Sequence, residues 1–336
     1  MKSILSYSLL AAAMAAGVAT AQPTTATTKP VGYVSLGNSG SVPANTDVSI
    51  SIPINRDTEF AGTVTSISGT SITVTGTPNW ATNQFTSVPY LVTIGGGAEE
   101  GLTAVVNANG SNTLQVVVVT GNLANVTSGT ALSVRKAWTI SALLPTGVIP
   151  NGTQLLAYDG ETAGINLAPT QIYTMTPSGW FLTLGGSGAS PNAILYPGES
   201  FVLRTAATAI TNLVVSGEVP VTKHRVALTK LSPSGTGQDV RASYLTPVDE
   251  AVGVAGFPAV NGDQILIYDN ASSGRNKAPT VILTKTPTGW FGTLGLSGNQ
   301  DAYVIPGGKG FVYRFSAANA PTTKDWSDVQ TYAPSL

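Results

Sequence analysis

Apolar and polar residues alternate along short stretches of this chain, and the alternation predicts β-strands along most of its length. In residues 47–54, every second side chain from Val48 to Ile54 is apolar. This period of two is typical of a strand that buries one face. Outside the N-terminal apolar stretch, helical spacing does not persist beyond one or two turns. The pattern therefore predicts an all-β fold.

Turn signals divide the first third of the chain into hairpins. Residues 62–76 contain two short strands around Gly69, and glycine supplies the positive φ that a tight hairpin needs. Further along, Asn109-Gly110 precedes the apolar run 114–119, and Asn-Gly between apolar runs is a strong hairpin signal. We expect residues 31–136 to form an N-terminal β domain, either a small barrel or a sandwich.

The remainder of the chain contains an internal repeat. Residues 152–188 match residues 262–298 at an offset of 110, and 21 of the 35 positions from Gln154 onward are identical. The match resumes between residues 196–204 and 305–314, and both segments end in arginine. A repeat of this length indicates duplicated domains rather than a solenoid.

Both copies follow the same order of predicted elements. A strand ending in Tyr-Asp leads into a Gly/Asn-rich loop, and Ala-Pro-Thr opens the next strand. A Thr-Pro-x-Gly turn then precedes a Trp-Phe-x-Thr-Leu strand, with proline presetting φ in the turn. We expect two homologous β modules, one at 137–246 and the other at 247–336.

The N-terminus has the features of a secretory signal peptide. Lys2 precedes a short apolar stretch, and Ala19-Thr20-Ala21 provides small residues for cleavage after residue 21. The stretch is shorter than the roughly 20 residues that cross a bilayer. We therefore expect an exported protein of the periplasm, cell surface or medium, without a transmembrane segment. Residues 22–30 predict a disordered lead, because they show no apolar periodicity.

Composition narrows the possible partners and cofactors. Only 10% of the residues are charged and the formal net charge is −1, so no basic surface for nucleic acid is expected. The chain contains no cysteine, which excludes disulfides and the usual cysteine-containing zinc sites. The sequence predicts no bound cofactor and no metal.

The chain resembles an uncharacterised family of exported all-β proteins from verrucomicrobial bacteria. The resemblance covers nearly the whole exported chain. It rests on the run SISIPINRDTEFAGTVTSISGTSITVTGTPNWATNQF, on the paired YD-x-G-x-N-x-A-P blocks, and on the endings at Arg204 and Arg314. Both modules depart from the family at the tryptophan, where Gly-Trp-Phe replaces the expected Ala-Trp-Arg. The resemblance implies an exported β protein and assigns no active site.

The duplication retains several residues that could bind a ligand. Exposed tryptophans can stack on sugars, and with neighbouring tyrosines they could form two related sites. Alternatively, each tryptophan fills the core of its module. The retained aspartates faintly resemble a calcium loop, although an Asx-type turn at the end of a strand is the simpler interpretation. The candidate ligand-binding residues are Tyr158, Asp159, Trp180, Tyr268, Asp269 and Trp290.

Groups suited to catalysis are few. His224 is the only histidine, and its basic neighbours predict a solvated surface position. The adjacent acid pairs Glu99-Glu100 and Asp249-Glu250 point to opposite faces of a strand, so neither pair converges on one bond. No catalytic residue is predicted.

These observations leave two classes of function open. The first is a secreted or cell-envelope structural or adhesive protein without catalytic activity, whose partners are copies of itself or envelope components. The scarcity of charge and of catalytic groups favours this class. The alternative is an extracellular glycan-binding module or a polysaccharide-active enzyme.

Overall fold

A computed structural model describes residues 29–160, 162–330 and 332. The expected signal peptide and most of the expected lead lie outside these residues. At the end of that lead, Lys29 Nζ lies 3.4 Å from the carboxylate of Glu218, and the carbonyl oxygen of Pro30 accepts a hydrogen bond from Val219. Residues 29 and 30 therefore pack against the folded protein.

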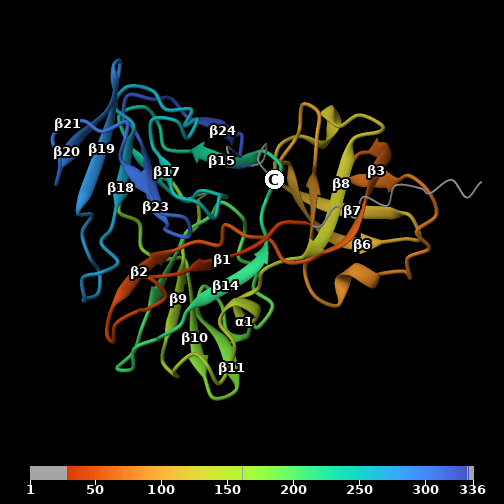
Figure 1. The fold of residues 1–336 in the computed structure, drawn as a ribbon, viewed down its shortest axis with the longest axis horizontal. Helices are drawn as coiled ribbons and strands as arrows, with labels where there is room; N and C mark the ends of the chain where they lie inside the picture. Colours follow the sequence, from red (N-terminus) through yellow and green to blue (C-terminus); the bar gives the residue numbers. More distant parts are fainter. Residues whose placement is uncertain (1–28, 161, 331, 333–336) are drawn as a thin grey trace, which may run out of the picture.

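The prediction of an all-β fold is confirmed. Strands dominate the described residues, and α1 (Ile140–Leu143) is a single turn of helix. Within the described part of the chain, no helix is long and apolar enough to cross a membrane. Figure 1 shows three bodies: a barrel and two modules built mainly from sheets.

The barrel is a closed six-stranded sheet in the order β3-β4-β7-β6-β5-β8. Its core contains the aromatic series Trp80, Phe85 and Tyr90, in which neighbouring rings lie 5.0–5.1 Å apart. The barrel strands are β3 (Thr58–Ser68), β4 (Ser71–Val74), β5 (Tyr90–Ile94), β6 (Thr103–Asn109), β7 (Thr113–Thr120) and β8 (Ala131–Lys136).

The first module combines a six-stranded sheet, β12-β11-β10-β9-β13-β2, with the strand pair β1-β14. Trp180 is one of the side chains in the core that these strands enclose. The strands are β1 (Val31–Ser35), β2 (Asp47–Ile50), β9 (Gln154–Ala157), β10 (Gln171–Thr176), β11 (Gly179–Leu184), β12 (Gly188–Ala189), β13 (Phe201–Arg204) and β14 (Val214–Glu218).

The second module repeats this plan. Its six-stranded sheet runs β16-β23-β18-β19-β20-β21, and β15-β24 and β17-β22 form separate pairs. Trp290 occupies its core. The strands are β15 (His224–Lys230), β16 (Gln238–Ala242), β17 (Glu250–Ala251), β18 (Gln264–Ile267), β19 (Val281–Thr286), β20 (Gly289–Leu294), β21 (Gly298–Asn299), β22 (Val304–Ile305), β23 (Phe311–Phe315) and β24 (Thr322–Asp328).

The domain boundaries differ from those expected. Strands β1 and β2 fall inside the expected 31–136 domain, yet they pack in the core of the first module. Strands β15 and β16 fall inside the expected 137–246 module, yet they belong to the second. The first module is therefore discontinuous, because the barrel interrupts it between β2 and α1.

Corresponding residues confirm this insertion. Arg204 and Arg314 are 110 residues apart, whereas Asp47 on β2 and Asp239 on β16 are 192 apart. The difference matches the length of the inserted barrel. In both modules the aspartate faces the arginine of the neighbouring strand, with Asp47 opposite Arg204 and Asp239 opposite Arg314.

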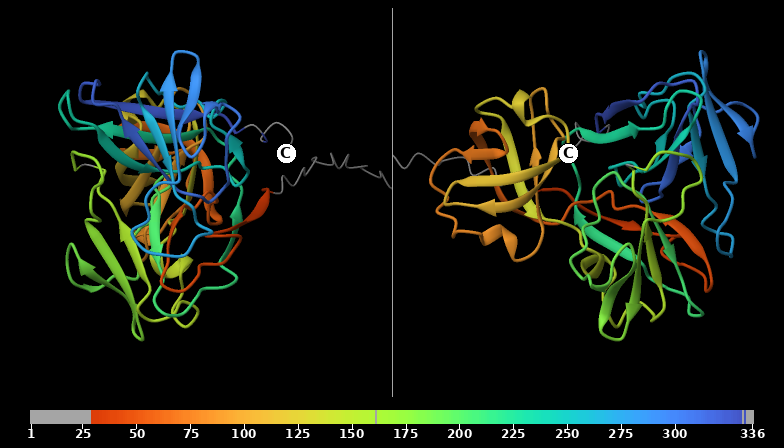
Figure 2. Two further views of the ribbon diagram at one scale, coloured as in Figure 1. Left: turned by 90° about the vertical axis from the view of Figure 1, so that its left-hand side faces the viewer. Right: turned by 180° about the vertical axis from the view of Figure 1, so that it is seen from behind.

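The two modules pack with approximate twofold symmetry along β2 and β16. Ser51 N donates to the carbonyl oxygen of Gly308 at 2.9 Å, and Ser243 N donates to that of Gly198 at 2.9 Å. These bonds satisfy backbone groups beyond the two edge strands, which would otherwise be open to pairing with another chain. In Figure 2 the two modules lie against each other while the barrel stands to one side.

Candidate ligand site between the two modules

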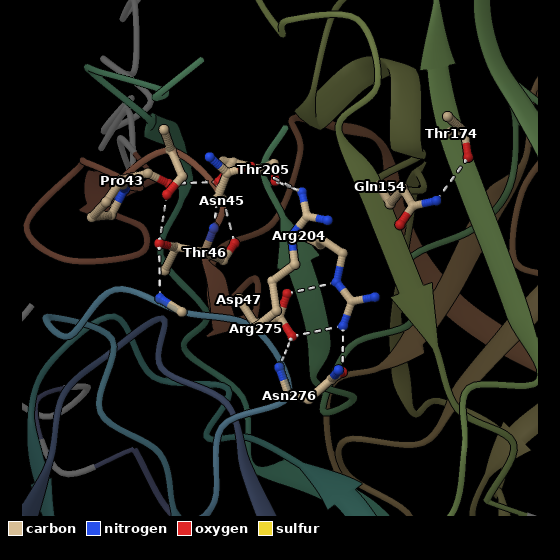
Figure 3. Close-up of polar contacts among 12 residues, drawn as sticks. Pro43, Asn45, Thr46, Asp47, Gln154, Thr174, Arg204, Thr205, Arg275 and Asn276 are labelled. Atoms are coloured by element: carbon tan, nitrogen blue, oxygen red, sulfur yellow. Dashed lines mark hydrogen bonds and ion pairs between the residues drawn. The ribbon is translucent and has the colours of Figure 1, made fainter. Parts of the chain in front are cut away.

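Each module extends a loop onto the edge strand of the other. The loop after β18 reaches the first module, where Asn276 N donates to Asp47 Oδ2 at 2.8 Å. Arg204 binds the same carboxylate through Nε at 2.7 Å and Nη2 at 2.8 Å. The side-chain oxygen of Asn276 accepts from Arg204 Nη2 at 2.7 Å. Figure 3 shows this closed set of contacts.

The loop after β9 makes the reciprocal contacts in the second module. Asn166 N donates to Asp239 Oδ2 at 2.8 Å, and Arg314 binds Asp239 through Nε at 2.6 Å and Nη2 at 2.8 Å. Asn166 Oδ1 accepts from Arg314 Nη2 at 2.9 Å. The two loops are thus exchanged between the modules, and each ends on an aspartate–arginine pair.

The sequence of the loops suits this geometry. Asn166 and Asn276 have φ angles of 53° and 52°, in the left-handed region. Asparagine enters this region more readily than other residues with a side chain. The hydrogen bonds to Asp47 and Asp239 raise the pKa of Arg204 and Arg314 respectively, which keeps both guanidinium groups charged. The exchanged loops are therefore held by charge-assisted hydrogen bonds.

A cavity of about 400 Å³ lies between these loops. Residues of both modules line it. Its size falls within the range of small-molecule sites. The lining includes Tyr158, Asp159, Asn166, Arg241, Tyr268 and Asn276.

Two tyrosines and one arginine form the most distinctive part of the lining. The guanidinium carbon of Arg241 lies 3.8 Å from the ring centroid of Tyr158 and 5.7 Å from that of Tyr268. Burial raises the pKa of the Tyr268 hydroxyl, which therefore stays protonated near neutral pH. The tyrosines come from equivalent positions after β9 and β18, and the exchange of loops brings them to one arginine.

The structure separates the two candidate aspartates. Asp159 lines the cavity between the modules, whereas Asp269 lines a different groove beside β1. Asp269 Oδ1 accepts from Ala271 N at 2.8 Å, which is the expected Asx-type turn. That hydrogen bond lowers the pKa of Asp269. Among the described residues, no group of three or more acidic or histidine side chains is placed to hold a metal ion.

Both candidate tryptophans are core residues and do not reach the cavity. Trp180 is 1% exposed, and its indole Nε1 donates to the carbonyl oxygen of Leu144 at 2.7 Å. Trp290 is 2% exposed and packs edge-on against Phe257, with ring centroids 5.8 Å apart. Neither ring is available as a platform for a sugar in this structure.

His224 is buried, so the prediction of a surface histidine is wrong. It is 2% exposed on β15, where its ring lies 4.3 Å from that of Trp326. Nδ1 accepts a hydrogen bond from Leu245 N at 3.0 Å. Burial lowers the pKa of His224 to about 3. The flanking Lys223 and Arg225 misled the prediction, because alternate residues of a strand face opposite ways.

Glu99 and Glu100 lie in a turn rather than on a strand, and Glu250 of the other pair has a different acidic partner. Glu250 forms a hydrogen-bonded pair with Asp328 of β24. Burial, followed by the charge of Asp328, raises the pKa of Glu250 to about 7. Glu99 instead accepts from Asn125 Nδ2 at 2.8 Å and lies 3.3 Å from Arg225. These carboxylates connect elements of the fold.

Sequence reasoning missed several residues of the cavity. Asn166 and Asn276 occupy identical positions in the repeat, which was a usable signal, as were the arginine endings of both copies. Arg241 had no such signal, because its counterpart in the first module is Ser49. The partners of the arginines, Asp47 and Asp239, lie in the weakly similar part of the modules.

Comparisons of this chain with protein-family models, with curated proteins and with solved structures found no match. The resemblance to exported verrucomicrobial proteins therefore stays a prediction.

Proposed function

We propose that this chain is an exported adhesive protein that binds a glycan in the cavity between its modules and does not turn it over. The convergence of Tyr158 and Tyr268 on one cavity carries the proposal. Duplication supplied the two tyrosines, and the exchanged loops bring both to the lining of a single site. The site is therefore a property of the paired modules.

The chemistry of the lining suits a sugar. A tyrosine ring offers a flat apolar surface to the C–H groups of a sugar ring, while its hydroxyl group can bind sugar hydroxyls. Asn166 and Asn276 add amide groups, and Asp159 adds a carboxylate. An apolar surface with a few fixed polar groups is the usual composition of a selective small-molecule site.

The carboxylates of the site support binding without hydrolysis. Glycoside hydrolysis ordinarily needs two carboxyl groups, one to protonate the leaving group and one to act as nucleophile or base. Asp47 and Asp239 each bind an arginine and a backbone N–H, so their oxygens are engaged in holding the loops. Asp159 is the other carboxylate among the described lining residues.

A panel of immobilised polysaccharides and peptidoglycan tests the proposal. The protein should be retained on at least one glycan, and Tyr158→Ala or Tyr268→Ala should weaken the retention by about tenfold or more. Tyr33→Ala is the matched control, because Tyr33 is 73% exposed on β1 and lies outside the cavity. Retention should be accompanied by no release of shorter sugars.

Release of shorter sugars would contradict binding without turnover, and two further results would contradict the binding itself. One is the absence of retention on every glycan of the panel by a protein that circular dichroism shows to be folded. The other is equal retention of the wild-type protein and of both cavity variants, which would place any glycan elsewhere on the surface.

A further inference from the structure

The cavity departs from twofold symmetry at one position. Arg241 of β16 corresponds to Ser49 of β2, since both lie two residues after the aspartates that bind the exchanged loops. Tyr158 and Tyr268, by contrast, are equivalent residues, yet both face Arg241. The site therefore has a pair of similar rings and a single guanidinium group between them.

One nitrogen of Arg241 lacks a hydrogen-bond partner. Its Nη1 atom is buried and has no acceptor among the described residues. No carboxylate of the described chain lies within 4.0 Å of its guanidinium nitrogens. Protein atoms cover Nη1, whereas Arg241 as a residue lines the cavity. An arginine held without a carboxylate is suited to bind one from a ligand. The rings of Tyr158 and Tyr268 hold the guanidinium plane in position.

The loop residues that correspond to each other beside Ser49 and Arg241 also differ in size. On the first module, the Asn270 side chain fills the space: it accepts from Ser49 N at 2.9 Å and donates to Ser49 O at 2.9 Å. The residue equivalent to Asn270 is Gly160, which has no side chain and lines the cavity. The cavity is therefore open on the side of Arg241, while an amide side chain occupies the equivalent space beside Ser49.

The charges around the cavity favour an anion. Asp47 and Asp239 are each paired with an arginine, so they contribute little net charge. Lys277 is a second cation in the lining, and its Nζ donates to the carbonyl oxygens of Asp269 and Ser272. The charges of Asp269 and Asp47 act on Lys277. Arg241 is therefore the lining cation, among the described residues, that is best placed to meet a ligand anion.

We propose that the cavity binds an acidic glycan, and that a carboxylate of one uronic acid residue accepts hydrogen bonds from Arg241. The sugar ring bearing this carboxylate lies beside Tyr158 and Tyr268. This inference rests on the proposed glycan-binding function and names its ligand class. The single guanidinium group selects one carboxylate and fixes one orientation at a site that is otherwise nearly symmetric.

Calorimetric titration with a trisaccharide of galacturonic acid tests the inference. The same trisaccharide with its carboxyl groups reduced to alcohols serves as the neutral ligand. Wild-type protein should bind the acid about 10–100-fold more tightly than the neutral form. Arg241→Met keeps the approximate length of the side chain and should remove that preference for the acid over the neutral trisaccharide. Arg241→Lys should retain only part of the preference for the acid, because a lysine cannot present two parallel donors.

Arg56→Met is the matched control, because the Arg56 guanidinium lies over Trp138 at 5.6 Å, outside the cavity. It should bind both trisaccharides like the wild type. Thermal unfolding should show that Arg241→Met remains folded, with at most a small fall in the midpoint from the lost contacts with the Tyr158 and Tyr268 rings. If Arg241→Met is unfolded, the test uses Arg241→Lys instead. The ratio of its affinities for the acidic and the neutral trisaccharide then shows whether Arg241 binds the carboxylate.

The outcomes separate this inference from the function on which it rests. If the wild type and Arg241→Met bind both trisaccharides equally, the carboxylate proposal fails while glycan binding stands. If the wild-type protein binds neither trisaccharide, the uronate proposal fails. The wider polysaccharide panel then decides whether the proposal of glycan binding fails as well. Binding of a sulfated trisaccharide in preference to the uronate would overturn the assignment to a carboxylate.

Discussion

Asn276 of the second module donates its backbone N–H to Asp47 of the first at 2.8 Å. The two residues lie 229 positions apart in the sequence, and the barrel lies between them. Together with Arg204 they join the modules, and Asn166, Asp239 and Arg314 repeat the arrangement. Both sets hold loops that line the cavity between the modules.

Loss of either aspartate should weaken the contact between the modules. In Asp47→Asn the partly buried Arg204 would lose its ionic partner, which should lower the free energy of unfolding by about 2–4 kcal/mol. Asp239→Asn should have a similar effect through Arg314. Urea denaturation measures the change, and Asp57→Asn, at an exposed position, is the control. A loss below about 0.5 kcal/mol would contradict the structural role.

The two core tryptophans should affect stability rather than binding. Trp180→Ala and Trp290→Ala should each lower the free energy of unfolding by about 3–5 kcal/mol, because each removes a large buried ring. Differential scanning calorimetry should show the loss in the affected module. A variant with wild-type thermal stability that no longer binds the glycan would instead assign the ring to the ligand site.

His224 should make the protein less stable in acid. Burial lowers its pKa to about 3 in the folded protein, whereas an unfolded histidine titrates near 6.5. The unfolded state therefore binds a proton first, and stability falls as the pH decreases from about 6.5 towards 3. His224→Gln should reduce the loss between pH 7 and pH 4.5 by roughly 2 kcal/mol. Identical pH profiles for both proteins would show that His224 does not titrate in this way.

Glu250 should have the opposite effect. Its pKa is raised to about 7 and that of Asp328 is also raised, so the folded state retains protons that the unfolded state has released. Stability from this pair is present at low pH and is lost as the pH rises through 7. Glu250→Gln should therefore be more stable than the wild type at pH 8, by about 1–3 kcal/mol. Urea denaturation at pH 5 and pH 8 measures the difference, and lower stability of the variant at pH 8 would contradict it.

The succession of strands and turns along the two modules was predictable because the duplication preserved turn residues and the alternating pattern. The insertion was not predictable, because the segments starting at Asp47 and Asp239 share only a few positions that fit many strands. The barrel separates β2 from its partner strand β13 in the sequence, so the two strands pair only after the chain has formed the barrel. Periodicity reports which face of a strand is buried, and it does not identify the strand beside it.

The candidate site was also partly predictable, because the duplication retained some of its residues. Tyr158 and Tyr268 were indicated because they recur at equivalent places, but their approach to one cavity depends on the exchange of loops. Arg241 occurs in one module alone, so the repeat carried no signal for it. The tryptophans recur equally well, and their recurrence reflects the need of each module for a core.

A crystal structure of the protein with the most strongly retained oligosaccharide would show whether a glycan binds between the two modules. We predict a sugar ring beside Tyr158 and Tyr268, within hydrogen-bonding distance of Arg241. Electron density for the sugar on any other surface, with the cavity holding only solvent, would contradict it.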